Sequence, residues 1–148
     1  MKKLILPILI AIISVYGTTG TIADKIIEYG MSRLGKKVDR GECWDLANAA
    51  LNESGADWTS PYEFGAKVDI NKTQRADILQ FSNIKMKLVN GSMSFPKHTA
   101  IVYKSNKKQI TLIHQNFNNK RYVDTLTINL DDIVKGKVEA FRPKANGS

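Results

Sequence analysis

The spacing of apolar residues changes along the chain from a helical to an alternating period, and this change limits the folds open to it. In the first half, apolar residues recur at helical spacing over residues 22–34 and again over residues 44–53. In the second half, apolar and polar residues alternate in short runs, as in strands that bury one face. Helices followed by a meander of antiparallel strands predict an α+β fold, with the helices packed on the sheet.

Turn residues separate the predicted elements. Gly35 and Gly55 follow the two predicted helices, where glycine commonly ends a helix. Residues 57–71 show little periodicity and predict an ordered loop with one short strand. The predicted strands are residues 77–81, 98–103, 109–116, 121–128 and 138–141, with a helical turn at 130–134. A chain of 148 residues without repeats favours one domain.

The start of the chain has the layout of a secretion signal. Two lysines precede an apolar run over residues 4–15, and small residues follow. This run is shorter than the ~20 residues that a helix needs to span a bilayer. An uncleaved membrane anchor is the alternative. We expect an exported protein, periplasmic or extracellular, with a signal peptide at 1–20, a domain at 22–143 and a tail at 144–148; cleavage would follow Gly17, Gly20 or Ala23.

The formal net charge of +8 favours anionic partners. The lysines are scattered, however, and do not form the basic stripe with interleaved aromatic residues that nucleic-acid binders carry. We therefore expect no nucleic-acid partner, a monomer, and at most an attraction to an anionic cell envelope. Plain solubility explains the same charge equally well.

Cys43 is the only cysteine, so the fold has no internal disulfide. A lone thiol in an oxidising compartment is a liability unless it is buried or used. Cys43 lies at or just before the first turn of the second predicted helix, where unpaired N–H groups favour a thiolate. Arg40 would support the thiolate, whereas Glu42 and Asp45 would oppose it. The alternative is a small buried core cysteine.

The two histidines lie on adjacent predicted strands. Alternation places His98, His114 and Asn116 on one face of this hairpin and Gln115 on the other. If Lys104 pairs with Lys108, His98 lies opposite His114; a register shifted by two places it opposite Asn116. Either neighbour is within reach of a hydrogen bond. Two histidines and one cysteine without close spacing are a weak ligand set, so we expect no metal and no other cofactor.

Four strings of residues resemble a known superfamily. They are Gly41-Glu42-Cys43-Trp44-Asp45-Leu46-Ala47, then residues 76–81, 98–102 and 113–116. Their order is similar to that of the NlpC/P60 and CHAP peptidases, bacterial papain-like hydrolases that cut amide bonds in cell-wall peptides. The resemblance covers residues 26–143. It implies a papain-like fold and a catalytic site made of Cys43, His98 and His114, with Asn116 as a further candidate.

The chain departs from these peptidases around the nucleophile and before the first predicted strand. Glu42-Cys43-Trp44 replaces the usual Asp-Cys-Ser or Gln-Cys-Thr, and Arg75-Ala76-Asp77 replaces Pro-Gly-Asp. The string around Cys43 and the closing residues 136–143 resemble a divergent branch, the cysteine-proteinase-fold domain at the end of certain fungal actin-patch proteins.

The resemblance implies a thiol hydrolase of amide or peptide bonds. His98 would take the proton of Cys43, and His114 or Asn116 would hold the His98 ring. The oxyanion hole would use the Cys43 N–H and one donor from Tyr29 or from residues 36–40. The substrate would be a peptide or a peptidoglycan-like polymer. Two alternatives are a secreted toxin or effector with the same chemistry and a non-catalytic binding module on the same fold.

Overall fold

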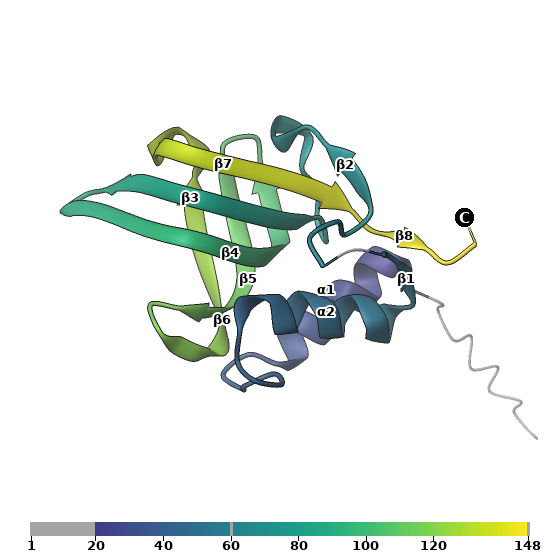
Figure 1. Ribbon diagram of the computed structural model, residues 1–148. Coiled ribbons are helices and arrows are strands. Elements are labelled where there is room, and N and C mark those ends of the chain that lie inside the picture. Colours follow the sequence, from purple (N-terminus) through teal and green to yellow (C-terminus); the bar gives the residue numbers. More distant parts are fainter. Residues whose placement is uncertain (1–19, 60, 148) are drawn as a thin grey trace, which may run out of the picture.

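The computed structural model describes residues 20–59 and 61–147. Two helices, α1 (Ile22–Ser32) and α2 (Cys43–Ser54), pack on a six-stranded antiparallel sheet (Figure 1). The sheet order is β2 (Ala66–Val68), β7 (Ile133–Arg142), β3 (Ile78–Leu88), β4 (Gly91–Asn106), β5 (Gln109–Phe117) and β6 (Lys120–Asn129). Short strands β1 (Ala56–Asp57) and β8 (Lys144–Ala145) pair with each other, and η1 (Ile70–Lys72) and η2 (Leu130–Asp132) are single turns. The predicted α+β fold is confirmed.

Both predicted helices form, and local sequence explains their ends. Thr21 caps α1, because its hydroxyl accepts the backbone N–H of Asp24. The helix ends at Ser32, slightly before the predicted end. Helix α2 begins at Cys43 itself and stops before Gly55, whose φ of 71° is the left-handed conformation that glycine adopts at low cost.

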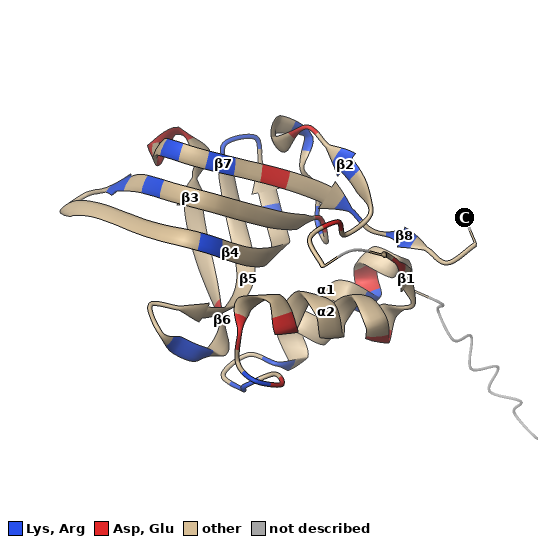
Figure 2. Cartoon of the chain, in the orientation of Figure 1, with Lys and Arg blue, Asp and Glu red and all other residues tan. Residues whose placement is uncertain are grey.

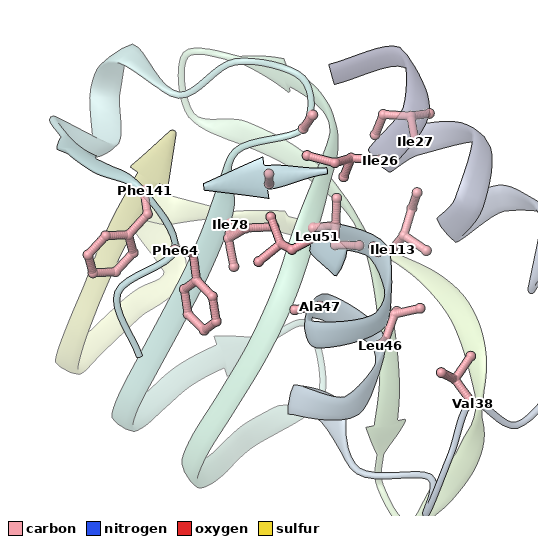
Figure 3. Packing of buried hydrophobic residues seen from close by; sticks show 14 of the residues in the cluster. Ile26, Ile27, Val38, Leu46, Ala47, Leu51, Phe64, Ile78, Ile113 and Phe141 are labelled. Atoms are coloured by element: carbon pink, nitrogen blue, oxygen red, sulfur yellow. The ribbon is translucent and has the colours of Figure 1, made fainter. Parts of the chain in front are cut away.

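The sheet separates two apolar clusters, and alternation along the strands fills both. On one face, Ile78, Ile101 and Ile113 pack against the two helices, as the sticks in Figure 3 show for the residues labelled there. On the other face, their neighbours, including Leu79 and Leu112, join a cluster with side chains from β3 through β7. The sheet therefore curls around this second cluster.

The hairpin of β3 and β4 is longer than predicted. Its strands run through residues 82–97, where the sequence analysis predicts no element. Its strands continue to a pair between Leu88 and Gly91, so that Val89 and Asn90 form the turn. The signals for this hairpin are present in the sequence. Apolar Ile84, Met86 and Leu88 alternate with polar residues, and Asn-Gly at the turn is a strong hairpin signal.

The register between β4 and β5 differs from the pairing of Lys104 with Lys108. A two-residue turn places Asn106 opposite Gln109, so Lys104 pairs with Thr111, and that predicted pairing is wrong. An irregularity between Val102 and Lys104 then shifts the register, and Ala100 lies opposite His114. This is the register of the second predicted alternative, although the described pairing ends before His98 reaches Asn116.

The structure describes most of the predicted tail but little of the predicted signal peptide. Residues 1–19 of the predicted signal peptide lie outside the described residues. Lys144 and Ala145, in the predicted tail, pair with Asp57 and Ala56 and so contribute a short strand. Within residues 20–59 and 61–147, no helix is long and apolar enough to cross a membrane.

Candidate active site

Cys43 is half-buried at the start of α2, and its thiol lies beside Thr99 of β4. Burial raises the pKa of the Cys43 thiol above its ordinary value, and the charge of Glu42 adds to the rise. Hydrogen bonds from Thr99 and from the Trp44 backbone oppose this rise only in part. Burial therefore works against the predicted thiolate, and the resting thiol is neutral at neutral pH.

The cation expected to support a thiolate is paired elsewhere. The Arg40 guanidinium donates to Oδ1 of Asp45 at 2.6 Å, and the Asp45 carboxylate is fully buried. The second oxygen of Asp45 accepts the backbone N–H of Glu42 at 3.0 Å. The first turn of α2 thus already holds an anion, and the charge of Arg40 is compensated there.

The structure brings His98 and His114 together. Both side chains are buried, and their ring centroids lie 5.3 Å apart at 70°. They are diagonal neighbours across β4 and β5, because Ala100 lies opposite His114. Rings of Phe81, Phe95 and Phe117 surround the pair.

Two ring nitrogens of this pair lack hydrogen-bond partners among the described residues: Nε2 of His98 and Nδ1 of His114. Burial lowers the pKa of His98 to about 3, and the neighbouring His114 contributes. Burial also lowers the pKa of His114, with Asp124 opposing the shift. Both imidazoles are therefore neutral at neutral pH, when each carries one donor and one acceptor nitrogen.

Cys43 and the histidine pair lie on opposite faces of the sheet, so the thiol does not face His98 as the site prediction requires. The hydroxyl of Thr99 donates to Oε1 of Gln80 at 2.7 Å, on the face of the sheet that the helices cover. The His98 ring joins the aromatic cluster on the opposite face. Within residues 20–59 and 61–147, no hydrogen bond joins the thiol to either imidazole. The resting structure brings the two histidines together but leaves the thiol on the other face of their strand, beside Thr99.

Gln115 holds the connector that leads into α2. Its side chain is fully buried, and its Oε1 accepts the backbone N–H of Val38 at 2.7 Å. Its Nε2 donates to the carbonyls of Val38 at 3.1 Å and of Glu42 at 2.8 Å. Alternation correctly separates Gln115 from the histidines but does not reveal this role. The sequence signal was a glutamine at a buried strand position, which needs polar partners.

The Asn116 side chain reaches Glu42 and not His98, which the site prediction gives as its partner. Its Nδ2 donates to Oε2 of Glu42 at 2.8 Å, and its φ of 60° interrupts the regular strand. In the described part of the chain, no hydrogen bond links Asn116 to His98. Of the two candidates for holding the His98 ring, the structure brings only His114 against it. Among the described residues, no group of three or more acidic, histidine or cysteine side chains could hold a metal ion.

Comparison with known proteins gives consistent matches. The family model described as the AIM3/BBC1 cysteine proteinase-fold domain matches residues 14–147. "Altered inheritance of mitochondria protein 3" from Debaryomyces hansenii is 26% identical over 153 residues, which cover 84% of this chain and 16% of that protein. The chain therefore spans about a sixth of this curated relative.

Two solved structures share the fold. "The crystal structure of Ly7917" superposes with a TM-score of 0.53 at 17% identity, covering 84% of this chain and 63% of that one. A second structure of the same protein, "with the hydrolyzing product of MDP", gives a TM-score of 0.53 at 16% identity and covers 82% and 62%. The predicted resemblance to a divergent cysteine-proteinase-fold branch is confirmed.

Proposed function

The chain belongs to the AIM3/BBC1 family of cysteine-proteinase-fold domains, and from this premise we propose that it is a thiol hydrolase of amide bonds. In this proposal Cys43 is the nucleophile, His98 is the base and His114 orients the base. The AIM3 relative is much longer than this chain, so the function of the whole relative does not transfer with the domain.

The observation that carries the proposal is the histidine pair with its two unpartnered nitrogens. A buried ring nitrogen without a hydrogen bond costs stability, so its presence calls for an explanation. The His98 ring lies on the face of the sheet opposite the thiol, so proton transfer between them requires a local change of register in β4 that moves His98 to the other face. The two unpartnered nitrogens leave the ring without hydrogen bonds that would oppose this change. Catalytic hydrogen bonds are often long in unliganded enzymes and tighten when substrate binds.

The protonation states define the chemical step. Because the resting thiol and the His98 ring are both neutral, the thiol proton must move to His98 while sulfur attacks the carbonyl carbon. His98 then gives this proton to the leaving amine as the C–N bond breaks. Water attacks the thioester with His98 again as base, which frees the acid and restores the thiol.

Peptide-like cell-wall material is the substrate class that we propose to test first. The support is indirect, because it comes from Ly7917, which has a crystal structure "with the hydrolyzing product of MDP". The start of the chain supports export, which would bring the protein to that material. N-terminal sequencing of protein secreted by its own host tests export, because it would find a new terminus after Gly17, Gly20 or Ala23.

The test is incubation of the full chain with purified peptidoglycan, followed by mass spectrometry of released fragments. We expect release by the unaltered protein, none by Cys43→Ala, and a loss of at least about 100-fold for His98→Gln. His114→Gln should be slower but active, since it acts through His98. Thr111→Ala, which loses one exposed hydroxyl contact with Thr127, is the matched control and should be unchanged. Equal release by Cys43→Ala would refute a thiol mechanism.

A non-catalytic binding module is the second candidate, favoured by the position of the thiol and the imidazoles on opposite faces of the sheet and by the same pKa shifts. A raised thiol pKa and a His98 pKa of about 3 make the first proton transfer unfavourable at rest. In that case the protein would sediment with peptidoglycan, Cys43→Ala would sediment equally, and no fragment would appear with either protein.

A further inference from the structure

The strands β3, β4 and β7 carry one sign of charge. Between them they hold six lysines and a single acid, Glu139. That acid is already contacted by Lys67 and Lys137. The lysines on these strands are Lys85, Lys87, Lys97, Lys104, Lys135 and Lys137. Figure 2 shows the blue segments on the three neighbouring strands, with little red between them.

Five of these lysines share one face of the sheet. Lys85 lies directly opposite Lys135, and Ser82 lies between Lys97 and Lys137 on its two neighbouring strands. The other face of the same strands belongs to the second apolar cluster. Like charges placed directly opposite each other destabilise a sheet, so an anionic partner would relieve a cost that is built into this surface. We name Lys85, Lys87, Lys97, Lys135 and Lys137 the lysine face.

Most of the lysine face has no counter-ion within the described residues. Lys137 contacts Glu139, whereas Lys85, Lys87 and Lys135 take part in no ion pair there. Lys97 lies 4.9 Å above the ring of Tyr62. A hollow lies beside the irregularity at Asn83 of β3. Its polar lining includes Lys85 of β3, Ser94 of β4 and Lys135 of β7.

An exposed apolar tip lies at the end of the same hairpin. Val89 is fully exposed and Leu88 is 48% exposed, both at the turn between β3 and β4. In Figure 1 this turn projects beyond the other strands. Aliphatic residues held at the tip of a hairpin, with lysines behind them, match the layers of a bilayer surface. Hydrocarbon would meet the tip, and anionic headgroups would meet the lysines.

We propose that the β3–β4 hairpin docks on an anionic lipid bilayer, with Leu88 and Val89 inserted and the lysine face against the headgroups. A nucleic-acid partner fits less well, because the tip is aliphatic and offers bases no aromatic surface on which to stack. Docking on a bilayer does not depend on catalysis, so its test is independent of the test of the proposed hydrolase.

The test measures binding of the full 148-residue chain to vesicles by sedimentation. The vesicles are phosphatidylcholine alone, or phosphatidylcholine with about 30% phosphatidylglycerol. We expect tighter binding to the anionic vesicles than to phosphatidylcholine alone, and loss of this difference when salt is raised to about 0.5 M. Residues 1–19 are present in every variant, so their contribution is common to all.

Matched variants separate the hairpin from net charge. Lys85→Gln, Lys87→Gln and Lys135→Gln together should weaken binding roughly 100-fold, at roughly fivefold per lysine. Lys25→Gln, Lys120→Gln and Lys144→Gln remove the same charge from exposed positions elsewhere and should change it far less. Leu88→Ser with Val89→Ser should weaken it roughly tenfold. All variants should keep the urea midpoint of the unaltered chain.

Three outcomes would overturn the proposal. Equal losses in the two lysine triples would leave only bulk attraction of a basic protein. An unchanged affinity of the Leu88/Val89 variant would remove the insertion step. Binding to a duplex oligonucleotide as tight as to anionic vesicles, lost in the same lysine triple, would reassign the lysine face to nucleic acid.

Discussion

At the scale of single residues, the thiol is controlled by opposing neighbours. Desolvation raises the pKa of Cys43, and the contacts with Thr99 lower it. Since the thiolate is the nucleophile, the balance sets how fast the thiol reacts at a given pH. Burial alone would make Cys43 an unreactive structural cysteine. Its reactivity therefore depends on the hydrogen bonds from Thr99 and on the contacts that a bound substrate adds.

Substitution of Thr99 by valine tests this balance. Loss of the hydroxyl contact should raise the thiol pKa further, so iodoacetamide labelling of Cys43 should shift to higher pH. For the unaltered protein, labelling at neutral pH should be slower than for a free thiol of pKa about 8.5. Labelling rates followed by mass spectrometry across the alkaline range provide the measurement. Faster labelling at acidic pH would mean that a cation reaches the thiol in solution.

Gln115 is the second residue whose substitution should be informative. Truncation to alanine removes three hydrogen bonds and leaves polar groups of Val38 and Glu42 without partners in a buried place. We expect a loss of about 2–4 kcal/mol in the free energy of unfolding. Urea denaturation gives this value, and Thr111→Ala on the same strand, which loses one exposed hydroxyl contact, should cost well under half of it. Equal costs would mean that Gln115 does not hold the connector.

Alternation alone, which places Gln115 on the face away from the histidines, would predict a near-neutral effect of Gln115→Ala. Alternation assigns each side chain to one face of the sheet, and it directs attention to the face that carries the two histidines. Gln115 joins a loop to a strand through hydrogen bonds to backbone groups. Because every residue carries such groups, these bonds leave no pattern in the sequence. Gln115 does lie on the face away from the histidines, but this is the face that also carries Thr99 and the thiol, so its unimportance does not follow from alternation.

At the scale of elements, a charged pair ties the start of β3 to the end of β7. Arg142 donates from Nε at 3.0 Å and from Nη2 at 2.9 Å to the two oxygens of Asp77, which is 1% exposed. The N–H of Gln74 also binds this carboxylate at 2.8 Å. The pair fixes the turn at Ala76, whose φ of 72° lies in the left-handed region that residues other than glycine rarely adopt.

Removal of the cation should be costly, because it leaves a buried carboxylate without its partner. We expect Arg142→Ala to lower the free energy of unfolding by about 3 kcal/mol or more. Lys67→Gln is the control: it removes an exposed contact with Glu139 and should change stability by about 0.5 kcal/mol or less. Asp77→Asn combined with Arg142→Ala should cost less than the sum of the single changes. Strict additivity would show that the two side chains do not act as a pair.

Elements with local signals were predictable, and their relative registers were not. Helix α2 ends just before Gly55, and the turn before β5 is polar, so both could be located from the sequence alone. The irregularity at Tyr103 decides which residues meet across β4 and β5, and the one at Asn116 does so for β5 and β6. Such irregularities reflect how the strands fit around two cores, which no single strand's sequence expresses. The candidate site inherits this limit: its residues were identifiable, but their contacts were not.

At the scale of the whole molecule, one sheet serves two cores with different chemistry. The cluster under the helices is closed by aliphatic and aromatic side chains, with Gln115 and Thr99 bonded at its edge. The cluster on the far face ends in the two histidines, whose burial keeps them uncharged. Folding therefore removes two ionisable groups from water, and the stability of the whole domain becomes linked to their protonation.

Acid should weaken the domain in a pH range set by His98. The unfolded chain binds a proton on this ring below its ordinary pKa of 6.5, whereas the folded protein binds it only near about 3. Acidification between these values therefore favours unfolding, by up to about 1.4 kcal/mol per pH unit, and stability is fully present only above the ordinary value. Urea unfolding between about pH 7 and pH 4 should show this slope. In His98→Phe, whose ring suits the surrounding phenylalanines, the slope should be shallower by most of that amount, leaving the smaller contribution of His114. Parallel profiles for the two proteins would mean that His98 is protonated in the folded state, and the neutral resting pair proposed for the active site would fail with it.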